Sequence, residues 1–309
     1  MRRYRPMRAL LFHNPTAGTK SFDKDGILAA LKLANIDAHY VSTKNDDVEA
    51  ALKKSADLFI VAGGDGTIRL IVTGAKDRSI PIAVLPLGTA NNIARSLGIS
   101  GTPVELVESW NIDRCLSLDI CQARGAWGTA PFLEAFGVGL IPAYLRMAAK
   151  GKKPEGADNL RKGRTMLQKA LKDAEPIDIE VAVDGKPVRG DLLGVEVLNI
   201  PFTGPGLPLG ARANAADGKL DVVCITKDSR KDLIAWLEAP MDSDPPVVSR
   251  EGSEVKLLWR EAPNRLDDKA FDNADKTHTA EICCEETPAC VLMPLKHPAQ
   301  VAHQEQASE

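Results

Sequence analysis

At 309 residues the chain is long enough for two domains of about 150 residues each. Its 44% hydrophobic and 26% charged residues are typical of a folded protein and exclude a disordered chain. The formal net charge of −3 excludes a surface dedicated to nucleic acid, and no apolar run approaches the ~20 residues of a membrane-spanning helix. We therefore expect a cytoplasmic protein that has no nucleic-acid partner.

The first third of the chain alternates short apolar runs with amphipathic stretches. This alternation predicts an α/β domain, in which helices cover both faces of a parallel sheet. Ligands of such sheets bind beyond the carboxyl ends of the strands. The expected strands are 9–12, 38–41, 58–62 and 82–85, and the expected helices lie around 27–34, 46–54, 68–73 and 93–97.

From about residue 116 the chain changes to short strand-like segments that turns such as Asp184-Gly185 separate. This pattern predicts an antiparallel β domain. The expected strands are 177–183, 194–200, 220–225, 255–259 and 289–293.

The cysteines are too few for a disulfide scaffold and form no C-x-x-C pair, so we interpret them as small core hydrophobes. Two of them are adjacent and would point to opposite faces of a strand. With only five histidines and no H-E-x-x-H motif, a zinc site is not expected. The six are Cys115, Cys121, Cys224, Cys283, Cys284 and Cys290.

The strongest chemical signal is Gly63-Gly64-Asp65-Gly66-Thr67, which directly follows the expected strand 58–62. Glycines at a strand-to-helix turn let backbone N–H groups approach an anion, and the following helix presents its positive end there. A carboxylate would repel bare phosphate, so Asp65 indicates either an intervening Mg²⁺ ion or a substrate hydroxyl to be oriented or deprotonated. A tight turn with an Asx-type hydrogen bond is the alternative.

Two further polar loops follow expected strands. The loop 13–18 has a common turn composition, and in the loop 86–92 Thr89 would cap the next helix, which alone would explain that residue. Because three such loops would converge on one crevice, together they predict a nucleotide-phosphate site. The chain contains neither a P-loop nor a dinucleotide fingerprint.

These loops resemble those of the diacylglycerol-kinase catalytic-domain family, in the bacterial lipid kinase branch related to sphingosine and ceramide kinases. The resemblance rests on 14–18, 63–67 and 87–92 and continues through 213–222. It implies an α/β nucleotide-binding domain like that of NAD kinases and phosphofructokinases at 1–115, with 292–309 as a candidate for completing it. It also implies an antiparallel β-sandwich domain at 116–291.

The activity that the resemblance implies is transfer of the γ-phosphate of ATP to a lipid hydroxyl. It assigns a Mg²⁺ site to Asp217 with the backbone carbonyls of Asn214 and Lys219, and oxygen ligands suit that ion. The residues alone would favour a hairpin turn at Asp217-Gly218. By position, the nucleotide contacts are Asn14, Thr43, Gly63, Gly64, Asp65, Gly66, Thr67, Gly88, Thr89 and Asn91.

The chain departs from the family pattern at three places. Arg69-Leu70 stands where the family has Asn-Glu, and Asn92 stands where it has Asp. Lys269 stands where the family has the Glu that is thought to activate the acceptor hydroxyl, and a lysine of ordinary pKa is protonated at pH 7. The substitute bases are Asp267, Asp268 and Asp272, and an alternative alignment uses Asp272-Asn273-Ala274.

Our hypothesis is an ATP- and Mg²⁺-dependent lipid kinase in which Asp65 and Asp268 are catalytic. The lipid would be reached by transient, peripheral contact with a membrane surface. The apolar segment 136–142 and the basic segment 150–172 are candidates for that contact, although core packing and a solvated helix and loop explain them as well. A kinase with a soluble acceptor such as NAD and a regulatory nucleotide-binding protein without catalysis are the alternatives. The sequence leaves open which lipid is used and whether the protein is a homodimer.

Overall fold

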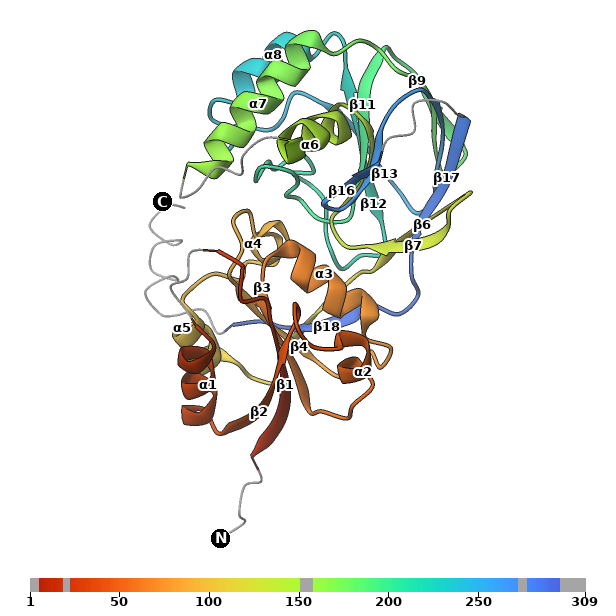
Figure 1. Ribbon diagram of the computed structural model, residues 1–309. Helices are drawn as coiled ribbons and strands as arrows, with labels where there is room; N and C mark the ends of the chain where they lie inside the picture. The colour runs from red at the N-terminus through yellow and green to blue at the C-terminus, as the bar shows by residue number, and fades with distance from the viewer. Residues whose placement is uncertain (1–5, 19–22, 151–157, 272–276, 295–309) are drawn as a thin grey trace, which may run out of the picture.

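The computed structural model describes residues 6–18, 23–150, 158–271 and 277–294 (Figure 1). In the lower half of Figure 1 helices flank one twisted sheet, and in the upper half two sheets and three helices form a second domain. Helices α3 (Asp65–Gly74) and α4 (Asn92–Ser96) lie where the two domains meet.

The lower domain is the expected α/β domain. Its sheet has the order β2-β1-β3-β4-β18-β5, and the first four strands are parallel. Strand β3 is buried along its whole length, as the run of apolar residues at 58–62 predicts. These strands are β1 (Met7–His13), β2 (Ile36–Ser42), β3 (Leu58–Gly63) and β4 (Ile82–Pro86), and the remaining helices are α1 (Lys24–Leu33), α2 (Val48–Leu52) and α5 (Pro103–Ser109).

Strand β18 (Ala289–Leu292) corrects one expectation. The sequence pattern places the segment 289–293 in the β domain, but β18 lies in the α/β sheet, parallel to β4 and antiparallel to β5 (Cys115–Leu118). A strand pattern specifies that a segment is extended and not which strand it pairs with. The expected domain boundaries, 115/116 and 291/292, fall inside β5 and β18.

A disulfide joins Cys115 of β5 to Cys290 of β18. The interpretation of these two residues as small core hydrophobes was therefore wrong: pairing of distant segments brings them together, and Cys115 is exposed. The other four cysteines are free.

The upper domain is the expected antiparallel β-sandwich. Between its sheets lies a core that includes Phe132, Phe136 and Trp259, each at most 1% exposed. One sheet has the order β10 (Lys186–Val188), β9 (Asp178–Val183), β14 (Val255–Arg260), β17 (Thr277–Cys284), β6 (Cys121–Gly125), β7 (Gly128–Phe132). The other has the order β13 (Val248–Gly252), β12 (Leu220–Thr226), β11 (Leu192–Leu198), β8 (Ala135–Gly139), β15 (Asn264–Leu266), β16 (Lys269–Phe271).

Three helices cover the outer face of the sheet that contains β11: α6 (Leu140–Lys150), α7 (Asn159–Asp173) and α8 (Arg230–Trp236). The segment 136–142 is buried in this domain and is core. Helix α7 buries Leu167 and Leu171 and exposes basic side chains, while Lys152 and Lys153 lie outside the described residues. None of the helices in the described ranges is long and apolar enough to cross a membrane.

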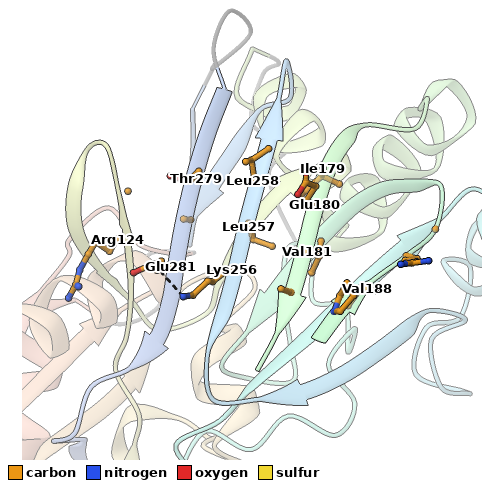
Figure 2. Close-up of a pocket in the computed structure, with 16 residues that line it drawn as sticks. Arg124, Ile179, Glu180, Val181, Val188, Lys256, Leu257, Leu258, Thr279 and Glu281 are labelled. Carbon is orange, nitrogen blue, oxygen red and sulfur yellow. Dashed lines mark ion pairs between the residues drawn. The ribbon is translucent and has the colours of Figure 1, made fainter. Parts of the chain in front are cut away.

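The opposite sheet is open to solvent. Its outer face forms a hollow of about 820 Å³, shown in Figure 2, where Lys256 forms an ion pair of 3.7 Å with Glu281. A second hollow of about 770 Å³ lies between α1 and α5. None of the described residues that line these two hollows is a site residue predicted from the sequence.

Candidate functional site at the domain junction

Two glycine loops touch at the carboxyl end of the α/β sheet. A Cβ atom on Gly88 would lie 2.5 Å from the Cα atom of Gly64, so this approach requires glycine. Gly64 is the N-cap residue of α3, and among the described residues no side chain caps this helix. The first turn of α3 thus faces the crevice with the positive end of its dipole, an arrangement that fits a phosphate group.

Asp65 points from the first turn of α3 toward the beginning of α4. Its Oδ1 atom accepts a hydrogen bond of 2.9 Å from the backbone N–H of Ile93. Burial raises the pKa of Asp65 to about 6, the nearby Glu134 carboxylate adds to this shift, and the N–H groups of Ile93 and Asn92 oppose it. This carboxylate is mostly ionised at pH 7 and is basic enough to accept a proton or bind a cation.

The first loop joins the same edge of the sheet. The Nδ2 group of Asn14 donates a 3.4 Å hydrogen bond to the Oγ1 atom of Thr67. A Cβ atom added to Gly18 would lie 2.1 Å from the carbonyl oxygen of Leu87, so this loop also packs against the loop 86–92. Residues 14–18, 63–67 and 86–92 therefore form one surface.

Three other predicted nucleotide contacts have distinct positions. Thr43 follows β2 and donates its backbone N–H to His13, one strand further out. Thr89 is exposed and is not the helix cap, since the N-cap of α4 is Asn91, whose φ is +49°. Both oxygen and nitrogen of the Asn91 side chain bond to the backbone of Gly88, at 2.8 and 2.9 Å, and this holds the loop in shape.

The turn between β15 and β16 brings two carboxylates from the sandwich to these loops. Asp267, with φ of +51°, is 5% exposed and accepts hydrogen bonds from the backbone N–H groups of residues 133–135. Burial raises its pKa to about 6, and Glu134 adds to the shift. The Nε atom of Arg69 lies 3.5 Å from its Oδ2 atom. Asp267 therefore anchors the turn.

Asp268 is the carboxylate that faces the glycine loop. Its side chain is 60% exposed, and a Cβ atom on Gly66 would lie 3.2 Å from its Oδ2 atom. The guanidinium group of Arg69 is 3.6 Å from its Oδ1 atom. Arg69, one of the departures from the family pattern, thus holds both carboxylates of the turn. Lys269, another departure, is exposed in β16.

A buried ionic network behind this turn was missed by sequence reasoning. Arg265 is 1% exposed and bonds to Glu134 at 3.0 Å and to Glu196 at 2.8 Å. Burial alone would lower the pKa of Arg265, but the two carboxylates outweigh it and raise the pKa. The signal was present, because Glu134 and Glu196 each interrupt an apolar run, and a charge that is buried with its strand needs a partner.

The same network explains Asn92. Its Nδ2 group donates to Glu134 at 3.0 Å and to the carbonyl of Gly204 at 3.1 Å. An aspartate here would place a second carboxylate against Glu134. The amide therefore suits the position and links α4 to the sandwich.

The proposed Mg²⁺ loop lies apart from these residues, where β12 begins. Asp217 is exposed and accepts a hydrogen bond from the backbone N–H of Lys219, while Asn214 bonds to the N–H of Ala216. Burial raises the pKa of Asp221 to about 6, and repulsion from Glu251 and Asp217 adds to this shift. Excess negative charge and oxygen donors fit a hard cation, although within the described ranges no three His, Cys, Asp or Glu side chains are grouped to hold a metal.

The fold and the loops define a class of protein. An α/β sheet joined to an antiparallel β-sandwich is also the fold of a solved NAD kinase and of a solved putative diacylglycerol kinase. A solved NAD kinase from Archaeoglobus fulgidus in complex with ATP superposes with a TM-score of 0.53 at 18% identity, over 97% of this chain and 99% of that one. At this identity the likeness establishes the fold alone.

Two family models match, and together they cover more than half of the chain. The diacylglycerol kinase catalytic domain matches residues 8–123, and the YegS C-terminal NAD kinase beta sandwich-like domain matches residues 159–262. Residues 8–123 of the chain therefore belong to the diacylglycerol kinase catalytic-domain family, and residues 159–262 to the YegS-type β-sandwich family.

Relatives of known name agree. A diacylglycerol kinase of Bacillus subtilis is 27% identical over 81% of this chain and 85% of its own length. A putative lipid kinase of Staphylococcus haemolyticus is 28% identical over 59% of this chain and 61% of its own. A solved putative diacylglycerol kinase from Bacillus anthracis gives a TM-score of 0.66 at 20% identity, covering 95% of this chain and 98% of that one.

Proposed function

We propose that this protein transfers the γ-phosphate of ATP to a hydroxyl group of a lipid at a membrane surface in the cytoplasm. The observation that carries the proposal is the meeting of the loops 14–18, 63–67 and 86–92 with the turn at Asp267-Asp268. Nucleotide and acceptor would then meet where the two domains join. Bound Mg²⁺–ATP would supply the transferable phosphate and neutralise its charge.

The glycine loops would hold the phosphates of ATP. Gly64 and Gly88 let the two loops pack backbone against backbone, and the beginning of α3 favours negative charge. Asn14 and the exposed Thr89 flank this surface and would contact the nucleotide. Asp65, ionised at neutral pH and pinned to α4, would orient the Mg²⁺ ion or the acceptor.

Asp268 would assist removal of the proton from the acceptor hydroxyl. It takes over the task that the family gives to the residue at position 269, because a lysine there cannot accept a proton while charged. Arg69 would hold Asp268 beside Gly66. Phosphoryl transfer depends mainly on positioning and charge neutralisation, so a carboxylate held in this way would suffice.

The membrane contact would come from the basic face of α7. Its exposed Arg161, Lys162, Lys169 and Lys172 would attract anionic head groups. Flotation with liposomes should show binding that requires anionic lipid and weakens as salt is added. Binding that ignores salt, or no binding, would contradict this part of the proposal.

The test of the activity is an acceptor panel. Purified protein is incubated with Mg²⁺, ATP labelled in the γ-phosphate, lipids with free hydroxyl groups in mixed micelles, and NAD. Label in a lipid is the expected result. Label in NAD would favour the soluble-acceptor alternative, and tight ATP binding without transfer would favour a regulatory protein.

Two variants separate the roles of neighbouring residues in this assay. Asp268→Asn should lower kcat by roughly 10²-fold or more, which is the usual contribution of a general base. Lys269→Gln is the matched control and should leave the rate within a few-fold of wild type. The reverse ranking would assign the decisive position to Lys269 and refute the role of Asp268.

A further inference from the structure

The chain passes between its two domains at two short crossings. It leaves the α/β sheet after β5, crosses at Asp119-Ile120 and enters β6. It returns from β17 through residues 285–288 into β18. On the α/β side the Cys115–Cys290 disulfide joins β5 and β18, the two strands that flank the crossings.

On the sandwich side a second pair of cysteines occupies the matching place. Cys121, the first residue of β6, lies directly opposite Cys284, the last residue of β17, in the antiparallel register. Their Sγ atoms are 2.8 Å apart. Residues opposite each other in antiparallel strands have Cα atoms about 4.5–5.5 Å apart, within the range of about 4.4–6.8 Å that disulfides span. A bond between them requires no rearrangement of the strands.

We propose that Cys121 and Cys284 are a redox modification site that forms a second, reversible disulfide across the domain junction. With Cys115–Cys290 it would close a covalent ring made of the segments 115–121 and 284–290, with both crossings inside it. The inference goes beyond the proposed kinase activity and does not depend on it.

The reaction is thiol–disulfide exchange with a small disulfide such as oxidised glutathione. Cys284 is partly exposed, whereas Cys121 is buried, so the oxidant meets Cys284 first. The Cys284 thiolate attacks one sulfur of the oxidant, forms a mixed disulfide and releases one glutathione. Cys121 loses its proton and attacks the Cys284 sulfur, which releases the second glutathione. Two protein thiols are oxidised, one protein disulfide forms, and the oxidant is reduced to two thiols.

Hydrogen bonds fix both crossings in place. The covalent ring would make these hydrogen bonds open less often. The N–H of Glu285 donates to Ile120 at 2.7 Å, so the two crossings bond to each other. The N–H of Asp119 donates to Ala215 in the sandwich at 2.7 Å. Arg78 of the α/β domain forms an ion pair of 3.4 Å with Glu285. A covalent link on both sides would reduce local opening between these anchors, and hydrogen exchange reports such opening.

The test exposes the purified full chain to buffers of decreasing reduced-to-oxidised glutathione ratio. Thiols are then alkylated under denaturing conditions and mapped by mass spectrometry. While Cys115–Cys290 is oxidised, four cysteines are alkylated under reducing conditions. As the oxidant increases, alkylation should be confined to Cys224 and Cys283, and a disulfide-linked peptide pair containing Cys121 and Cys284 should appear. Dithiothreitol should reverse the change. Exchange at the amides of Asp119 and Glu285 should slow severalfold in the oxidised protein.

Cysteine variants serve as controls for this test. Cys284→Ser should abolish the linked peptide and the change in exchange, and the matched control Cys283→Ser, at the adjacent exposed residue, should leave both intact. Cys121→Ala supplies the second loss-of-link variant. The proposal is overturned if Cys121 and Cys284 stay alkylatable while Cys115–Cys290 is oxidised, if only a glutathione adduct on Cys284 accumulates, or if the link forms without slowing exchange.

Discussion

Replacing Asn92 by aspartate, the residue more usual in the family, should destabilise this protein strongly at neutral pH. The wild-type amide donates 3.0 Å and 3.1 Å hydrogen bonds to Glu134 and to the carbonyl of Gly204. In Asn92→Asp the single Nδ2 group that makes both bonds becomes an oxygen that faces two acceptors. The side chain is buried, so water cannot relieve the contact.

The size of the effect follows from this geometry. Two unit charges 3.0 Å apart repel each other by about 5.5 kcal/mol at an effective dielectric constant of 20. Loss of a hydrogen bond to a charged group costs about 1.5–3 kcal/mol. Protonation of one carboxyl limits the total, since each pKa unit of forced proton uptake costs about 1.4 kcal/mol. We expect a loss of roughly 3–5 kcal/mol in the free energy of unfolding at pH 7.5.

The pH dependence identifies the cause. The new carboxyl pair has a folded-state pKa above its unfolded value, so the native state binds the extra proton and the variant loses stability as pH rises. Urea denaturation at pH 5 and pH 7.5 should show a smaller deficit at the lower pH. Asn92→Ala, which removes the hydrogen bonds without adding charge, should lose about 1–3 kcal/mol equally at both values. An Asn92→Asp variant as stable as wild type at pH 7.5 would refute this account of the network.

Three further perturbations have definite outcomes. Burial raises the pKa of Asp267 from 3.8 to about 6, so this group makes the stability of the wild-type protein fall as pH rises from 4 to 6. Denaturant titrations of Asp267→Asn should show a shallower fall over this pH range. Equal slopes in the two proteins would count against a buried titrating carboxyl group at this position. Gly88→Ala places a Cβ atom 2.5 Å from the Cα atom of Gly64 and should lower both the Tm and the affinity for ATP in calorimetry. The control Gly98→Ala, at a residue with φ of +69° and open space around it, should lower the Tm alone. Unchanged ATP affinity in Gly88→Ala would contradict the assignment of this loop to phosphate binding. Added Mg²⁺ should raise the Tm of wild type and not that of Asp217→Asn, and an equal rise in both would move the ion elsewhere.

In the α/β domain, local patterns in the sequence predicted the four parallel strands and the loops that follow three of them. The apolar run 58–62 is buried along its length as β3, and the glycines after it begin α3 as the strand-to-helix turn required. These features depend on residues within a few positions of each other. The parallel sheet then brings the loops 14–18, 63–67 and 86–92 to one edge because all parallel strands share a direction.

Features that depend on distant pairing were not predictable in the same way. The strand 289–293 was recognised, but its place between β4 and β5 depends on partners about 170 to 210 residues away. The same pairing created the Cys115–Cys290 disulfide that the cysteine spacing did not indicate. Lys269 drew attention as a missing base, whereas the compensating contact, Arg69 with Asp268, joins α3 to a turn of the other domain.

The most direct test of the central claim is phosphate transfer by Asp65→Asn. The variant is first shown to have the circular dichroism spectrum of wild type, and both proteins are then assayed with γ-labelled ATP, Mg²⁺ and the lipid acceptor found in the panel. The proposed site, in which Asp65 at the start of α3 bonds to the beginning of α4, predicts a loss of roughly 10²- to 10⁴-fold in kcat. A folded Asp65→Asn protein that labels the lipid at the wild-type rate would contradict it.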